Sequence, residues 1–124
     1  MFPDVKWLVI KYLNEELETP VYSRVPKARP SSFIRVLLAG GTGQINPALE
    51  EVAVTLESWN TDEHGAFLQA EKARQALRSI RNVGGNPVYR YREWGPPVDL
   101  PDESGQWRYT FTFSIRLRDR KSVV

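Results

Sequence analysis

The chain has 124 residues, of which 41% are hydrophobic, and its 17 basic and 15 acidic side chains leave a net charge of +2. This length suits one domain with one core, and so balanced a charge does not by itself indicate nucleic-acid binding. The absence of cysteine excludes disulfides and thiolate chemistry and fits an intracellular origin. The apolar runs are too short to span a bilayer, and no secretory signal is expected.

The first third of the sequence predicts a helix, a short extended segment and a strand. Residues 3–17 carry one apolar stripe at helical spacing, with Pro3 suited to the first turn. Residues 21–26 are extended, and the prolines of 26–30 make a stiff loop. Residues 31–39 have apolar side chains on both faces, which is typical of a central strand.

Three glycines in four positions mark the stretch LLAGGTGQIN at 37–46. A phosphate-binding P-loop needs a Gly-Lys pair, which the chain lacks, and the third glycine of a dinucleotide fingerprint would fall on Asn46. The pattern from Val52 onward is that of a strand, so no helix N-terminus follows to hold an anion. We therefore expect Gly40–Gln44 to be a mobile loop between two strands.

The middle of the chain predicts a strand, a helix and another strand. Residues 51–59 alternate between apolar and polar side chains, as a half-buried strand does. A helix capped by Thr61 or Asp62 follows, with alanines and larger apolar residues on one face, and ends near 82–85. Residues 86–94 form the next strand, before a long connection.

The last strand has the most regular pattern in the sequence. Residues 107–118 alternate six times between an apolar and a polar side chain, which predicts an antiparallel strand with one face on the core. The order of elements predicts an α+β fold with a mainly antiparallel sheet of four to five strands and two helices packed on one face. We expect a single domain over 1–124, with 119–124 a flexible tail.

Catalytic and metal-binding patterns are weak throughout. His64, the only histidine, lies at a polar helix start, where a surface position outweighs a role as general base. The serines lack the setting of a nucleophile elbow. Two acidic clusters have no EF-hand spacing and are expected to be solvated: Glu15, Glu16 and Glu18, and Asp99, Asp102 and Glu103. We expect no enzyme activity, no cofactor and no metal.

Four tryptophans are more than a core of this size needs. The patterns place Trp7 and Trp107 inward. Trp59 and Trp94 lie at strand ends beside loops, where local packing or a protein interface could use them. Packing is the preferred interpretation for both.

Four stretches of the sequence follow one another in a distinctive order: the helix DVKWLVIKYL, then PVYSRVPKARPSSFIRVLLAGG, then VAVTLESW, and finally GPPVDLPDESGQWRYTFTFSIRLR. Together, and with the alanine-rich helix between the last two, they resemble the tail terminator (tail completion) proteins of long-tailed siphophages, particularly those of actinobacteria. The resemblance covers about residues 3 to 118. It rests on overall pattern and phrases, not on a catalytic signature.

The resemblance implies a virion protein at the joint between tail and head, assembled in the host cytoplasm. Such a protein forms a hexameric ring that ends polymerisation of the tail tube and joins the tail to the head connector. Its partners are other copies of itself, the tail-tube protein and the head-closure or connector protein. DNA passes through the lumen without sequence-specific binding, and neither a cofactor nor a membrane is involved.

Regions, not individual roles, carry over from this family. The matching loops are Arg29–Pro30, Gly40–Gln44 and Asp99–Gln106, and we expect Gly40–Gln44 to become ordered against a ring or tail partner. The expected protein contacts are Arg29, Gly41, Thr42, Gln44, Asp102 and Glu103. The polar face of the last strand could line the lumen through Arg108, Arg116 and Arg118.

Two other functions remain open at this point. One is another neck component of the virion, such as a head-closure protein. The other is a small ligand-binding or enzymatic α+β domain whose site has no recognisable motif.

Overall fold

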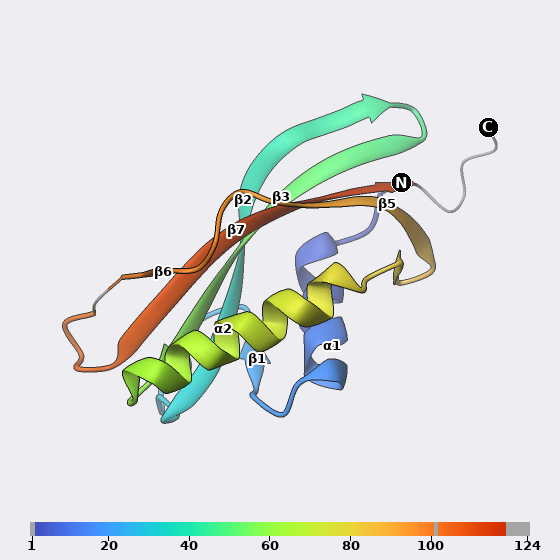
Figure 1. Cartoon of the computed structure of the whole chain (residues 1–124). Helices are drawn as coiled ribbons and strands as arrows, with labels where there is room; N and C mark the ends of the chain where they lie inside the picture. The colour runs from blue at the N-terminus through green and yellow to red at the C-terminus, as the bar shows by residue number, and fades with distance from the viewer. Residues whose placement is uncertain (1, 101, 119–124) are drawn as a thin grey trace.

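The computed structural model of the chain describes residues 2–100 and 102–118, and the side chains of Thr42 and Val83 lie outside this description (Figure 1). Two helices, α1 (Val5–Glu16) and α2 (Glu63–Arg78), lie on one side of a sheet. The expected tail at 119–124 lies outside the described residues. The seven strands are β1 Val21–Tyr22, β2 Ser32–Asn46, β3 Leu49–Asn60, β4 Asn82–Val83, β5 Asn86–Glu93, β6 Val98–Asp99 and β7 Trp107–Arg118.

The sheet is mixed but mostly antiparallel. Its order is β1-β2-β3-β7-β5-β4, with β6 paired to β7. Of the strand pairs in the described residues, only β1 and β2 run parallel to each other. The predicted α+β fold is confirmed, and the strand number exceeds the expected four to five because β1, β4 and β6 are pairings of two residues each. The strand predicted to be central, β2, has β3 on one side and the two-residue strand β1 on the other. It is therefore close to the edge of the sheet.

Side-chain caps set the start of each helix. Asp4 caps α1, its Oδ1 accepting from the Trp7 backbone N–H at 3.1 Å, so Pro3 precedes the cap instead of lying in the first turn. Of the two predicted caps of α2, Asp62 is the one used, and it accepts from the Gly65 N–H at 2.8 Å. The predicted end near 82–85 is too late, because α2 ends at Arg78 and Asn82–Val83 pairs as β4.

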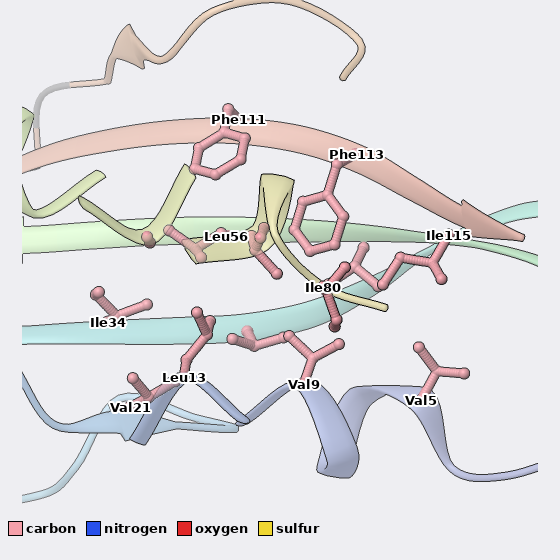
Figure 2. Close-up of a cluster of buried hydrophobic side chains, with 14 of the residues drawn as sticks. Val5, Val9, Leu13, Val21, Ile34, Leu56, Ile80, Phe111, Phe113 and Ile115 are labelled. Atoms are coloured by element: carbon pink, nitrogen blue, oxygen red, sulfur yellow. The ribbon is translucent and has the colours of Figure 1, made fainter. Parts of the chain in front are cut away.

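The core lies between the two helices and one face of the sheet. Figure 2 shows Val9 and Leu13 of α1 pointing toward Leu56 of β3 and toward Phe111 and Phe113 of β7. These positions are those predicted by the helical stripe and by the alternation in 107–118. Because β3 and β7 pair in register along their whole length, their inward side chains form one continuous apolar surface.

The glycine-rich stretch is part of β2, so the predicted mobile loop is wrong. Gly43 pairs with Glu51 and Gln44 with Glu50, and the chain reverses only after Asn46, whose Oδ1 accepts from the backbone of Ala48 and Leu49. Gly40, Gly41 and Gly43 have positive φ, and the register shifts around them. The glycines therefore bulge and bend the strand instead of ending it. Figure 1 shows the resulting β2–β3 hairpin reaching beyond the helices.

The tryptophans are distributed differently from the expectation. Trp7 is 57% exposed and Trp107 36%, so neither points into the core. Trp7 flanks the buried stripe of α1, and Trp107 is the first residue of β7, at the end of the sheet. Trp59 is buried at 3% exposure, as the packing interpretation requires, whereas Trp94 is 59% exposed.

Candidate interaction surfaces

The face of the sheet opposite the helices carries many of the polar side chains of the long strands β3 and β7. Because Leu56 and Phe111 point into the core, the alternate side chains of β3 and β7 point to this second face, which we call the open face. Here Glu57 lies beside Arg35, and Thr55 Oγ1 is 2.9 Å from Thr112 Oγ1. The open face is therefore polar but closely cross-linked between strands.

Trp59 is the centre of a packed cluster at one end of the open face. Its ring stacks on Phe33 with centroids 5.5 Å apart and planes within 9°. The guanidinium carbons of Arg29 and Arg108 lie 5.1 and 4.9 Å from the Trp59 ring centroid. We call Arg29, Phe33, Trp59 and Arg108 the Trp59 cluster. Two cations held on one indole ring make a rigid anchor for the loop that carries Arg29.

Ion pairs extend the Trp59 cluster in two directions. Glu57 lies 3.4 Å from Arg35 and 3.6 Å from Arg108. Arg29 lies 3.4 Å from Asp102, in the long connection before β7. Hydrogen bonds from Ser104, with a smaller contribution from Arg29, hold the pKa of Asp102 below its ordinary value. The loop before β2 and the loop before β7 are thereby fastened to each other.

The expected contact residues fall in two separate places. Arg29 and Asp102 meet beside Trp59, and the exposed Glu103 follows in the same loop. Gly41, Thr42 and Gln44 lie along β2 in the projecting hairpin. The sequence resemblance named both regions, but only the fold separates them into two surfaces.

The three arginines expected to line a lumen differ in their surroundings. Arg108 is held by Glu57 and Trp59, and its Nε donates to the Leu100 carbonyl at 3.2 Å. Arg116 pairs with Glu51 at 3.6 Å, and Arg118 Nη1 lies 3.4 Å from the Tyr89 hydroxyl. All three lie on the open face because they alternate with the core residues of β7. The side chain of Arg108 is therefore held in place by contacts within the protein.

Some buried side-chain donors beneath the open face have no hydrogen-bond partner among the described residues. Among the described residues, the buried side-chain nitrogens without a hydrogen-bond partner are Arg35 Nε, Trp59 Nε1 and Arg116 Nε. All three belong to open-face positions of β2, β3 and β7. Buried donors left unpaired in this way carry a desolvation cost in the folded protein.

Three residues of this face were missed by reasoning from the sequence. Glu57 was read only as part of an alternating strand, and Arg90 and Arg92 only as parts of 86–94. The alternation Arg-x-Arg in β5 was the available signal for the two arginines. Its meaning depended on β5 lying beside β7, which puts Arg90 opposite Arg116.

Within the described residues, no three His, Asp or Glu side chains gather as a metal site would require. The helices of the same part of the chain are too short and too polar to cross a membrane.

No protein-family model matches this chain, and no curated protein matches it. The resemblance to tail terminators therefore rests on the quoted sequence phrases alone.

Replacing Arg29 by alanine is expected to loosen the loop before β2. The change removes one cation from the Trp59 ring and the ion pair with Asp102, at a cost of about 1 kcal/mol in the free energy of unfolding. Trp59 is the one tryptophan of the four that is buried, so its blue-shifted emission should become more sensitive to acrylamide quenching. Arg24→Ala, in the same loop and exposed, is the control, and equal quenching in both variants contradicts the anchoring role.

Proposed function

We propose that this protein is a structural subunit of a phage virion that forms a hexameric ring on the tail tube. In this role it ends tube polymerisation and joins the tail to the head connector, without catalysis and without a cofactor. The sequence phrases shared with tail terminators suggest the family. The observation that carries the proposal is the outer edge of β2 on the projecting hairpin.

The β2 edge is suited to pairing with another protein chain. On its outer side, β2 pairs with β1 at only Ile34 and Arg35 among the described residues. From Val36 to Ile45 the strand has no charged side chain, and Leu38 and Ile45 are 54% and 43% exposed. Natural proteins protect such edges with charges, prolines or bulges. The β2 edge has the bulges at its glycines but neither a charge nor a proline from Val36 to Ile45, which favours the addition of a further strand there.

The opposite edge of the sheet has a different character. There β5 presents Arg90 and Arg92, and its outer side pairs with β4 at only Asn86 and Pro87 among the described residues. Two unlike edges on one subunit favour head-to-tail association, in which one surface meets a different surface of the next copy. Repetition of such a contact closes a ring when the rotation between neighbours allows it.

Negative-stain imaging and light scattering of the purified protein, alone and mixed with its tail-tube protein, test this proposal. We expect sixfold rings with an open lumen in at least one of the two samples. Leu38→Lys should abolish them because a lysine protects the β2 edge. Leu68→Lys, at an exposed leucine of α2, should leave them intact. A protein that stays monomeric in both samples overturns the proposal, as does a ring that survives Leu38→Lys but not Leu68→Lys.

A further inference from the structure

Four arginines gather on the open face where β5 lies beside β7. Arg90 is directly opposite Arg116, and Arg92 is opposite Ser114. Arg118 follows Arg116 on the same face, because side chains alternate along a strand. We call Arg90, Arg92, Arg116 and Arg118 the arginine patch. Two of its members come from β5, and the patch lies away from the Trp59 cluster.

Carboxylates of the described residues balance the arginine patch unevenly. Glu51 pairs with Arg116, and Tyr89 supplies a hydroxyl to Arg118. Arg90 and Arg92 are exposed and form no ion pair with another described residue. Like charges directly opposite each other on paired strands lower stability. The sequence therefore places a destabilising pair, Arg90 and Arg116, on a surface with little compensation.

We propose that the arginine patch binds the sugar–phosphate backbone of duplex DNA, without reading its bases. Guanidinium groups match phosphate oxygens with two parallel hydrogen bonds, and they stay charged at any physiological pH. The choice of duplex DNA as the source of phosphates rests on the proposed function, because the resemblance to tail terminators implies that DNA passes through the ring. Binding by a flat strand face contacts the backbone, whereas base readout needs an element inside a groove.

The spacing of the arginines favours a polyanion over an acidic protein surface. Alternate residues of a strand are ~7 Å apart and neighbouring strands ~5 Å apart, so the four charges share a small area. Duplex DNA carries a phosphate charge for every ~1.7 Å of its axis, so several phosphates lie within the span of a cationic patch of this size. Acidic side chains on a folded surface are rarely packed as closely, since they repel one another.

Arg90→Gln/Arg92→Gln is the variant that tests this proposal. The matched control is Lys11→Gln/Lys72→Gln, which removes the same charge from exposed positions on α1 and α2, over the opposite face of the sheet. Fluorescence anisotropy with two labelled duplexes of unrelated sequence measures affinity as the salt concentration rises. We expect equal binding of both duplexes by the wild type.

The arginine variant should lose at least about tenfold in affinity, and its slope of log K against log salt should fall by about 1.8, or ~0.9 for each phosphate contact. The lysine control should keep the wild-type slope. Equal losses in the two variants would mean that net charge alone governs binding, which overturns the proposal. Absence of duplex binding in the wild type overturns it as well. The proposal is also overturned if the arginine variant loses binding to poly-glutamate, a polymer of acidic side chains, while its affinity for the duplexes is unchanged.

Imaging of the same variants separates this proposal from the proposed function. Rings of Arg90→Gln/Arg92→Gln with weakened DNA binding support both. Rings of the wild type that do not bind duplex DNA leave the ring proposal standing and overturn the arginine patch. Duplex binding by a protein that never forms rings supports the patch and overturns the ring.

Discussion

Gly41→Ala is expected to destabilise the protein by about 3 kcal/mol, a fall of roughly 10 °C in melting temperature. Gly41 has φ +107°, and a Cβ there would lie 2.8 Å from both the Ala53 nitrogen and the Glu51 carbonyl oxygen. These are backbone atoms of the paired strand β3, so they can move away only by opening the hairpin. Thermal and urea unfolding of the variant measure the loss.

Gly43→Ala provides a matched control two residues farther along the hairpin. Gly43 also has positive φ, at +76°, but a Cβ there has no neighbour within 4 Å. Only the backbone preference is lost, at a cost of ~1–2 kcal/mol. Equal destabilisation by the two substitutions would mean that the close approach of β2 to β3 at Gly41 has no special cost, and would contradict the prediction.

Glu93→Gln is expected to lower the free energy of unfolding by about 2–3 kcal/mol at neutral pH. Glu93 lies at the end of β5 and accepts hydrogen bonds from Arg74 and Arg78 of α2, with N–O distances of 2.9 to 3.2 Å, and from the Tyr91 hydroxyl at 3.0 Å. Bonding to Arg74, above all, lowers the pKa of Glu93 from 4.5 to about 2. The variant leaves two guanidinium groups without this carboxylate.

The pH dependence of this contribution has a definite sign. Because the pKa of Glu93 is lower in the folded protein, the stabilisation is complete above about pH 4.5 and is lost as the pH falls toward 2. Urea unfolding of the wild type and Glu93→Gln over this range should give a difference in free energy that shrinks with acid. Glu103→Gln, at an exposed loop position, should change little at any pH. A difference between wild type and Glu93→Gln that is constant from pH 7 to 2 would contradict the assigned ion pairs.

Periodic patterns in the sequence predicted the elements of the core well. The alternation in 107–118 places Phe111, Phe113, Ile115 and Leu117 of β7 in the core as expected, although Trp107 is exposed. The helical stripe of Val5, Val9 and Leu13 is also buried as expected. Both patterns are local consequences of backbone geometry, since a strand repeats every two residues and a helix every 3.6. In a strand, the residues two positions apart share a face, and in a helix those four positions apart do. The polarity of these near neighbours therefore indicates which face is buried.

The glycines of LLAGGTGQIN were misread because their local preference has two structural outcomes. Positive φ is required in a loop, but it is equally required at a bulge inside a strand. The pairing of Gly43 with Glu51, together with the turn made by Asn46 beyond the glycines, decides between them. The deciding hydrogen bonds come from β3, so no property of the glycines themselves could reveal them.

The sequence by itself determined the α+β class, the two helices, the alternating strands and the absence of a recognised nucleotide-binding motif, because each follows from composition or from local periodicity. The tertiary structure alone decided which arginines share a surface and which are neutralised. Arg108 is held by Glu57 and Trp59, while Arg90 and Arg92 lie beside Arg116 and have no carboxylate partner among residues 2–100 and 102–118. Such distinctions depend on the order of strands in the sheet, which brings distant residues together through long-range pairing that no local pattern encodes.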